Sequence, residues 1–190
     1  MNLLFRLFPM MSYRKYLFKS ERLGFRNWIE EDAPKMVAIS ADPVVMEYFP
    51  SVATPDQTIG FIKRMQSMQA EKGYCYFAID ELETGEFIGF IGLCDQDFEV
   101  EFCPCTDIGW RLDLKYWNRG YATEGATACL DYAFETIGLK EVFSTTPVIN
   151  TASINIMLKM GMEKYSNYVH PKLIDNERLK NCVCYKITNS

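Results

Sequence analysis

The chain has 190 residues, of which 48% are hydrophobic and 24% charged, an ordinary balance for a soluble protein that can form its own core. Its formal net charge of −5 supplies no global positive field, so the composition argues against a nucleic-acid-binding protein. No apolar run is long enough to span a membrane, and we expect neither a membrane nor a nucleic acid among its partners.

The cysteines indicate the cellular compartment. Their number is odd, 7, and they are scattered over expected strands and helices, which is typical of reduced thiols in a cytoplasmic protein. An alternative is a four-thiolate zinc site formed by Cys103, Cys105, Cys182 and Cys184. Cysteines that bind zinc are usually separated by two or more residues, and alternate residues of a strand share a face in any case, so we predict no metal.

Residues 1–19 are expected to be an N-terminal extension of uncertain structure, and residues 20–190 a single domain. The extension contains basic residues and no acidic ones. Arg6 interrupts its apolar run and no small-residue cleavage site follows, which is a poor pattern for a signal peptide. Three interpretations stay open: an amphipathic arm, a surface helix, or an upstream start codon with Met10 or Met11 as the true start.

The first half of the domain alternates strand and helix signals. Thr54 and Gln57 form a capping-box pattern at the start of the longest expected helix, which ends at Gly73. In chain order, we predict a strand at 21–27, a helix at 31–40, a short helix that starts at Asp42, a helix at 55–72, and a hairpin of strands at 74–80 and 86–93.

The second half begins with an acidic loop at 95–105, which contains Asp95, Asp97, Glu99 and Glu101. Helix caps are expected at Asn150, which starts a helix, and at Gly138, which ends one. The predicted elements are a strand at 108–112, a helix that ends at Gly138, a strand at 141–148, a helix at 151–160, and strands at 163–169 and 181–188. Strands dominate the middle of the chain and helices flank them, so the pattern predicts an α/β or α+β fold.

Residues 108–123 read as a strand, a loop of small residues and the start of a helix. Gly120 and Ala122 would let a ligand approach the backbone closely. The first N–H groups of a helix lack internal partners and lie at the positive end of its dipole, so this arrangement is typical of a phosphate site. A plain strand-to-helix connection that contains a glycine is the alternative interpretation.

The same stretch, Ile108–Leu112 and Tyr116–Ala126, together with the later Asn150–Ser153 and Lys159–Met162, resembles the GNAT superfamily of acyl-CoA-dependent N-acetyltransferases. The branch it is most similar to is the RimJ/RimL type, which acetylates N-terminal amines of ribosomal proteins. The family's loop pattern is Gln/Arg-x-x-Gly-x-Gly/Ala. Gly120 and Ala122 match this pattern, whereas Trp117 occupies the Gln/Arg position.

This resemblance implies a GNAT-like central mixed, largely antiparallel sheet with helices on both sides. It implies acetyl-CoA as co-substrate, with the pantetheine along the strand that holds Ile108, Gly109 and Trp110, and a bulge near Gly109 that separates this strand from the next. Asn150 and Ser153 would meet the CoA arm. The pyrophosphate would bind the loop of Trp117, Asn118, Arg119, Gly120, Tyr121, Ala122 and Thr123.

The implied reaction is direct attack of an amine on the thioester, which needs a base. The candidate catalytic residues are Glu101, Asp107 and His170; a solvated acidic loop and a structural histidine before a proline are the plainer alternatives. Many relatives have a tyrosine acid seven positions after the asparagine, where this chain has Met157.

The acceptor implied by the branch is a protein N-terminal amine, with a small-molecule amine as the second possibility. The protein would act as a monomer or a homodimer. A non-catalytic acyl-CoA-binding or regulatory module is the alternative function, because Met157 cannot donate a proton.

Overall fold

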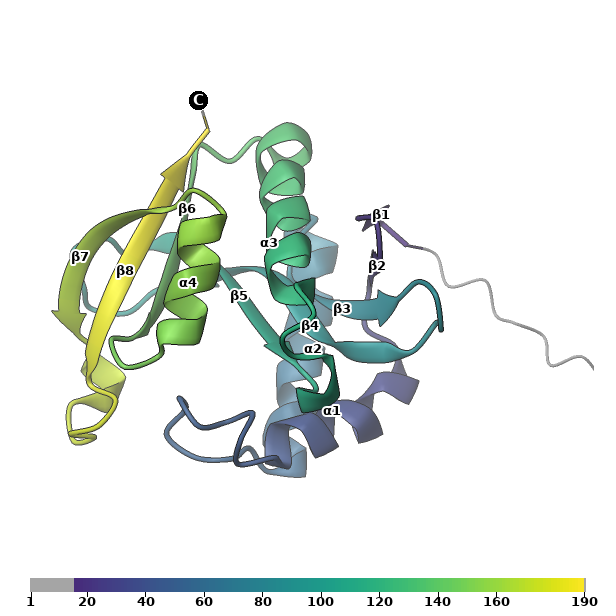
Figure 1. Ribbon diagram of the computed structural model, residues 1–190, viewed down its shortest axis with the longest axis horizontal. Helices are drawn as coiled ribbons and strands as arrows, with labels where there is room; N and C mark the ends of the chain where they lie inside the picture. Colours follow the sequence, from purple (N-terminus) through teal and green to yellow (C-terminus); the bar gives the residue numbers. More distant parts are fainter. Residues whose placement is uncertain (1–15, 190) are drawn as a thin grey trace, which may run out of the picture.

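One twisted sheet organises the part of the chain that the computed structural model describes, residues 16–189 (Figure 1). It begins with two short strands, β1 (Phe18–Lys19) and β2 (Leu23–Arg26), which pair antiparallel. The sheet thus starts two residues before the expected domain boundary at residue 20. The three interpretations offered for residues 1–11 fall outside the described residues.

Eight strands form the sheet, in the order β1-β2-β3-β4-β5-β6-β8-β7. All neighbouring strands pair antiparallel except β5 and β6, which are parallel. The expected mixed, largely antiparallel sheet is therefore confirmed. The remaining strands are β3 (Tyr76–Glu81), β4 (Phe87–Gln96), β5 (Cys105–Leu112), β6 (Glu141–Pro147), β7 (Glu163–Val169) and β8 (Asn181–Thr188).

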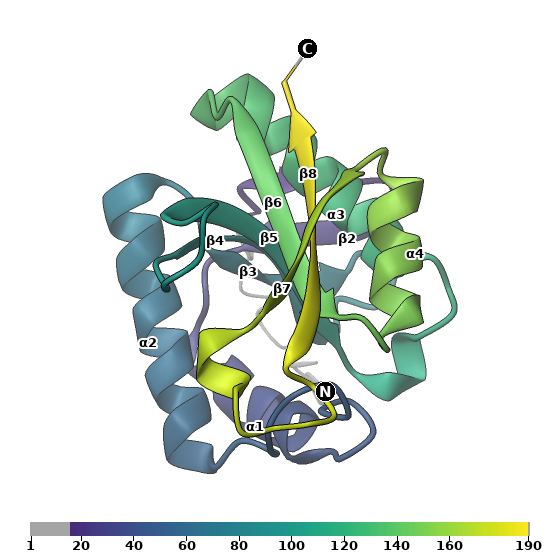
Figure 2. The ribbon, with the colours of Figure 1, turned by 90° about the vertical axis from the view of Figure 1, so that its left-hand side faces the viewer.

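Helices cover both faces of the sheet, as predicted (Figure 2). One face carries α1 (Ala33–Ala41) and α2 (Pro55–Lys72), and the other carries α3 (Tyr121–Asp131) and α4 (Thr151–Lys159). The helix of α3 continues as a π-helical segment, Tyr132–Ile137, which the apolar periodicity did not predict. Short 3-10 turns lie at Glu30–Asp32, Leu114–Tyr116 and Pro171–Leu173. No helix among residues 16–189 combines the length and the apolar character needed to cross a lipid bilayer.

The predicted helix ends are largely confirmed because their signals are local. Thr54 and Gln57 form the capping box of α2, Asn150 caps α4, and Gly138 has a positive φ of 79° where the helix after α3 ends. The short helix expected from Asp42 is wrong, because residues 43–48 form turns. The Asp42 carboxylate accepts a hydrogen bond of 2.8 Å from the backbone N–H of Val44, which stabilises a turn as well as it would a helix start.

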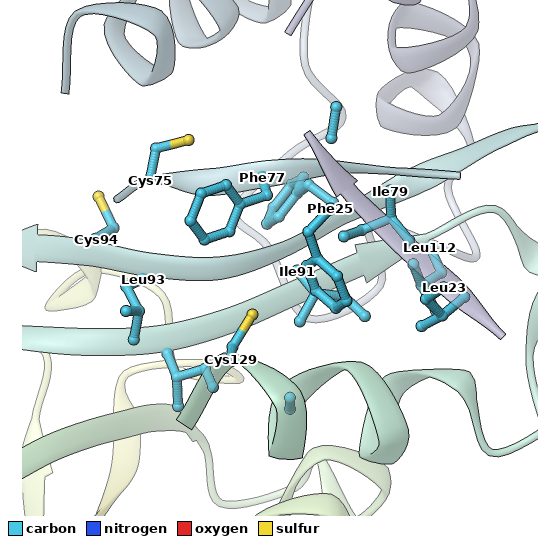
Figure 3. Close-up of a cluster of buried hydrophobic side chains, with 14 of the residues drawn as sticks. Leu23, Phe25, Cys75, Phe77, Ile79, Ile91, Leu93, Cys94, Leu112 and Cys129 are labelled. Atoms are coloured by element: carbon cyan, nitrogen blue, oxygen red, sulfur yellow. The ribbon is translucent and has the colours of Figure 1, made fainter. Parts of the chain in front are cut away.

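The main core lies between the sheet and its helices and is built from the alternating residues of β2, β3 and β4 (Figure 3). Leu23, Phe25, Phe77, Ile79 and Ile91 are all fully buried. A smaller cluster of Phe102, Phe143 and Cys184 packs the segment between β4 and β5 onto the α1/α2 face of the sheet. The core thereby fixes β5 from both sides, which matters because the candidate site is built on that strand.

Candidate active site

Strands β5 and β6 separate along most of their length. Their pairing consists of Asp107 opposite Phe143, and just beyond it Ser144 Oγ donates a hydrogen bond of 2.9 Å to the carbonyl of Ile108. In the described chain, β5 then runs on to Leu112 without pairing to β6 (Figure 1). Its backbone groups on that side are open to an extended ligand, which can bind as an added strand.

The bulge expected near Gly109 is not in the pairing of β5 with β4. That ladder keeps one register along all of β5, with Gly92 opposite Gly109. The separation arises on the other edge, because β4 holds β5 along its length while β8 holds β6 from Glu141 to Pro147. Each strand is thus fixed by its outer neighbour, and the gap between them needs no bulge.

The wide end of this gap faces the N-termini of two helices that pack side by side, α3 and α4 (Figure 1). In a sheet with parallel strands, ligands typically bind beyond the carboxyl ends of strands that diverge, where helix N-termini point. The two helices start differently. Asn150 caps α4, whereas no side chain caps α3 after Gly120. The first N–H groups of α3 are therefore available to an anion.

The loop before α3 has the backbone shape predicted for a phosphate cradle. Asn118 and Gly120 both have positive φ, 58° and 81°. Trp117 anchors the loop, because its Nε1 donates a hydrogen bond of 2.9 Å to the carbonyl of Leu112 at the end of β5. The loop from Trp117 to Gly120 is exposed, Tyr121 is buried, and Ala122 and Thr123 are half-buried.

A set of hydrogen bonds that the sequence did not reveal holds this loop against the turn between β1 and β2. The Glu124 carboxylate accepts hydrogen bonds from Ser20 Oγ at 2.6 Å, from the backbone N–H of Arg22 at 2.8 Å and from Arg22 Nε at 2.7 Å. Arg22 Nη1 donates in turn to the carbonyl of Arg119 at 3.0 Å. The Arg119 side chain remains exposed at the loop, beside the ring of Tyr116 at 5.6 Å.

The first turn of α4 is an internally satisfied unit. Asn150 Oδ1 accepts from the backbone N–H of Ser153 at 3.2 Å, and Asn150 Nδ2 donates to Thr146 Oγ1 at 3.0 Å and to Ser153 Oγ at 3.1 Å. Asn150 is buried, and its side chain caps α4. Ser153 is half-buried beside the gap.

Asp107, the only candidate base on β5, lies on the face of the strand opposite α3. Tyr76 Oη donates a hydrogen bond of 2.6 Å to Asp107 Oδ1, and Gln96 Nε2 lies 3.4 Å from the same phenol oxygen. The Tyr76 ring lies against Gly109, where a Cβ atom would come within 3.1 Å of it. Glycine at this position leaves room for the ring and for the hydrogen bond.

Burial raises the pKa of Asp107 to about 6, although the hydrogen bonds from Tyr76 and Gln96 oppose the rise and the charge of Asp95 adds to it. Burial also raises the pKa of Tyr76 well above its usual range, so the phenol stays protonated and keeps donating. A carboxylate with a pKa near neutrality inside a site is suited to accept a proton from an amine.

The structure does not bring the other two catalytic candidates to Asp107. Glu101 lies in an exposed turn between β4 and β5. His170 stacks on Phe98 with ring centroids 4.8 Å apart, and its Nδ1 accepts from the backbone N–H of Lys172 at 3.2 Å, which caps the 3-10 turn that follows. Burial lowers the pKa of His170.

The acidic loop is also shorter than predicted. Asp95 belongs to β4 and accepts hydrogen bonds from Tyr74 Oη at 2.7 Å and from Thr106 Oγ1 at 3.0 Å, as well as pairing with Lys72. Its carboxylate is therefore engaged inside the fold. Only Asp97, Glu99 and Glu101 remain in the exposed segment.

Met157 stands at the position where the resemblance to the GNAT superfamily implies a tyrosine acid. Its side chain is fully buried in the main core, on α4.

Cys103 and Cys105, two of the thiols considered as zinc ligands, have sulfurs 3.7 Å apart. Across residues 16–189, no group of three or more His, Cys, Asp or Glu side chains is arranged to hold a metal ion.

Comparison with known proteins identifies the family. Residues 22–163 match the acetyltransferase (GNAT) domain, which is most of the chain. The protein therefore belongs to the GNAT acetyltransferase family and is an acyltransferase.

Sequence relatives and solved structures support this family assignment. The uncharacterized N-acetyltransferase YoaA of Bacillus subtilis is 26% identical over 153 residues, 78% of this chain and 83% of YoaA. The crystal structure of a GNAT-family acetyltransferase from Bacillus anthracis superposes with a TM-score of 0.75 at 27% identity, over 90% of this chain and 96% of that one. The ribosomal-protein-S5-alanine acetyltransferase of Vibrio fischeri shares the fold, with a TM-score of 0.73 at 16% identity over 91% and 96% of the two chains.

Proposed function

We propose that this protein transfers an acetyl group from acetyl-CoA to a primary amine by direct attack of the amine on the thioester. The observation that carries the proposal is the gap between β5 and β6, which opens on the uncapped start of α3 and has Asp107 on its opposite face. One ligand can then reach the strand edge from the helix side, while a second approaches from the side of Asp107.

In this proposal the pantetheine arm of acetyl-CoA lies along the open edge of β5, at the backbone of Ile108, Gly109 and Trp110. The pyrophosphate binds the loop from Trp117 to Thr123, where the N–H groups of α3 and the exposed Arg119 offer positive charge. Asn150 and Ser153, at the start of α4, lie next to the arm. Acetyl-CoA is a co-substrate, and the reaction needs no metal.

The chemistry assigns a role to Asp107. The amine nitrogen forms a bond to the thioester carbonyl carbon while a backbone N–H near Ile108 or Gly109 stabilises the negative oxygen. The carbon–sulfur bond then breaks, the amine proton passes to Asp107, and the CoA thiolate takes a proton from water, because Met157 has none to give. The hydroxide that this leaves takes the proton from Asp107, which restores the carboxylate. The amide and free CoA are the products.

The acceptor is a primary amine of a protein N-terminus or of a small molecule. The RimJ/RimL-like motif and the shared fold with a ribosomal-protein acetyltransferase support the first. We place the reaction in the cytoplasm, in a monomer or homodimer, without membrane or nucleic acid.

Thermal unfolding with and without acetyl-CoA tests the cofactor site. Acetyl-CoA at about a hundred times its dissociation constant should raise the free energy of unfolding by about 2.7 kcal/mol. For a chain of this size, that raises the midpoint of thermal unfolding by about 5–10 °C. The shift should disappear in Gly120→Glu. Gly138→Glu is the matched control, because Gly138 has a φ of 79° against 81° for Gly120 but ends its helix away from the loop. Both variants carry a similar backbone strain, so only the loss of the ligand shift distinguishes them.

The same proteins should be incubated with acetyl-CoA and a mixed library of amines, with products read by mass spectrometry. Acetylated amines from wild type and Gly138→Glu, but not from Gly120→Glu, would support the transferase. An acetyl-CoA shift without any acetylated product would instead support the non-catalytic acyl-CoA-binding module.

A further inference from the structure

The pairing of β5 with β6 ends after one pair of residues, and a side-chain hydrogen bond lies at the point where it ends. Asp107 is opposite Phe143, and the next residue of β6, Ser144, donates from its hydroxyl to the carbonyl of Ile108 at 2.9 Å. Ser144 is only 2% exposed, so water does not compete for this bond. These four residues form the fork at which the gap between the two strands begins.

The register shows which pair would come next if the two strands stayed together. Successive pairs of a parallel ladder are two residues apart, so Gly109 would lie opposite Thr145. On the edge of β5 that faces β6, such a pair uses the carbonyl of Ile108 and the N–H of Trp110. The described chain has no pair at this position, and the Ile108 carbonyl accepts from Ser144 Oγ. The serine hydroxyl thus binds the acceptor with which the second pair would begin.

The outer strands hold β5 and β6 apart beyond the fork, but they do not determine where the fork lies. β4 pairs with β5 from Cys105 to Leu112, and β8 pairs with β6 from Glu141 to Pro147. Both ladders thus run past the fork in one register, and neither changes there. The feature that is particular to the fork is the hydroxyl of Ser144.

The next hydroxyl on the same face of β6 binds the other wall of the gap. Residues two apart on a strand share a face, which places Thr146 with Ser144. Thr146 Oγ1 accepts a hydrogen bond of 3.0 Å from Asn150 Nδ2, at the residue that caps α4. Ser144 therefore ties β6 to β5 at the fork, and Thr146 ties it to the start of α4 farther along the gap.

We propose that Ser144 is a positioning residue for acetyl-CoA: its hydroxyl ends the β5–β6 pairing at Ile108 and keeps the strand edge at Trp110 free for the pantetheine arm. This rests on the proposed acetyltransferase function, because that edge is where acetyl-CoA is proposed to lie. Without the hydroxyl, the buried Ile108 carbonyl loses a donor, which is costly for a group that water cannot reach. The N–H of Thr145 is the donor that the register offers in its place. The pairing then extends by one pair and occupies the edge at Trp110.

The test compares variants of the full chain that differ in one hydroxyl. Ser144→Ala removes the hydroxyl, Ser144→Cys replaces it by a weak donor, and Ser144→Thr keeps it on a side chain that suits a strand. Ser40→Ala is the matched control, because Ser40 is 1% exposed and its hydroxyl accepts a hydrogen bond of 3.2 Å from Arg111, also on β5. Both alanine variants lose a buried hydroxyl that is bonded to the same strand, and only Ser144→Ala changes the fork.

Affinity is measured by titration calorimetry with two probes, acetyl-CoA and adenosine 3′-phosphate 5′-diphosphate, the nucleotide half of CoA that has no pantetheine arm. Ser144→Ala should raise the Kd of acetyl-CoA about 10-fold, the effect of one hydrogen bond lost at a buried group, and leave the Kd of the nucleotide unchanged. Ser144→Cys should give a smaller rise. Ser144→Thr and Ser40→Ala should bind both probes like wild type.

Amide hydrogen exchange, followed by NMR without any ligand, reports on the strand edge itself. Exchange of the Trp110 N–H should be at least about 10-fold slower in Ser144→Ala than in wild type, because the extended pairing protects it.

Three results would overturn the proposal: equal Trp110 exchange in wild type and Ser144→Ala, an equal loss of acetyl-CoA affinity in Ser144→Ala and Ser40→Ala, or an equal loss for acetyl-CoA and the nucleotide in Ser144→Ala. A serine with only a structural role would lower the midpoint of thermal unfolding and leave the Kd of acetyl-CoA unchanged, which also overturns it. A wild type that binds no acetyl-CoA refutes the proposed function instead, and the exchange of the Trp110 N–H then decides separately whether Ser144 ends the pairing.

Discussion

Tyr76 and Asp107 are joined by a hydrogen bond of 2.6 Å although their strands, β3 and β5, are not neighbours in the sheet. The phenol crosses the face of β4, whose Gly92 is paired with Tyr76 on one side and with Gly109 on the other. Two residues without side chains thus lie in line beneath this contact. The arrangement keeps a titratable carboxylate buried, on the strand edge where the thioester is proposed to bind.

The first prediction concerns pH. Since the pKa of Asp107 is about 6, the acidic limb of kcat/KM should have its midpoint near pH 6, with activity lost as the pH falls through it. Asp107→Asn should lower kcat/KM by about 100-fold or more, the usual contribution of a general base, and should remove this limb. A limb that persists unchanged in the variant would assign it to another group.

The raised pKa of Asp107 also predicts how the free energy of unfolding depends on pH. The pKa of Asp107 is raised in the folded protein above its ordinary value of 3.8, so the unfolded chain binds fewer protons between these two values. The free energy of unfolding should therefore fall as the pH rises from about 4 to about 6, and stay reduced above. Asp107→Asn should be more stable than wild type at pH 7.5 and equally stable at pH 3, as measured by urea unfolding; a variant that is less stable at pH 7.5 would contradict this.

Tyr76→Phe separates positioning from catalysis. The phenol stabilises the ionised Asp107 carboxylate, so its removal should raise the pKa of Asp107 above 6 and move the acidic limb of kcat/KM to higher pH. Binding of acetyl-CoA should be unchanged. A purely structural role for Tyr76 would lower the rate without moving the limb, so the position of the limb decides between the two.

Removal of the buried Arg26 side chain should have the largest effect on the free energy of unfolding. Its guanidinium neutralises Asp32 and Asp80, all three side chains being nearly inaccessible to water. Arg26→Ala would remove this guanidinium from two buried carboxylates and should lower the free energy of unfolding by about 3–5 kcal/mol in urea titrations. Lys115→Ala, which breaks only the exposed pair with Glu86, should cost less than about 1 kcal/mol and serves as the control. Equal losses of unfolding free energy in the two variants would contradict the stabilising role given to Arg26.

The sequence was informative where the signal is local. Thr54, Gly73, Gly138 and Asn150 mark helix ends through their own backbone or side-chain preferences, and each stands where predicted. The loop before α3 was found for the same reason, from its small residues and its place between a strand and a helix. The turns after Asp42 were missed because a side-chain acceptor of this kind stabilises turns and helix starts alike.

The rest of the candidate site depends on contacts between distant residues. The hydrogen bonds between Glu124 and Arg22 span 102 residues, and no periodicity carries that information. Ser144 is a second case, because in the sequence it is an ordinary polar residue of the strand predicted at 141–148. Only the structure shows that its hydroxyl binds the carbonyl of Ile108, 36 residues earlier in the chain.

The last prediction concerns the thiols. All 7 cysteines are buried or half-buried, and burial raises the pKa of Cys94 and Cys184 to about 12 and that of Cys182 to about 11. Since the thiolate is the reactive form, the native protein should react slowly with a colorimetric thiol reagent at pH 7.5, whereas in urea all 7 should react quickly. If so, the reagent can follow CoA release by the native enzyme over a small blank. A fast reaction of the native protein would show that at least one thiol is more accessible than its burial implies.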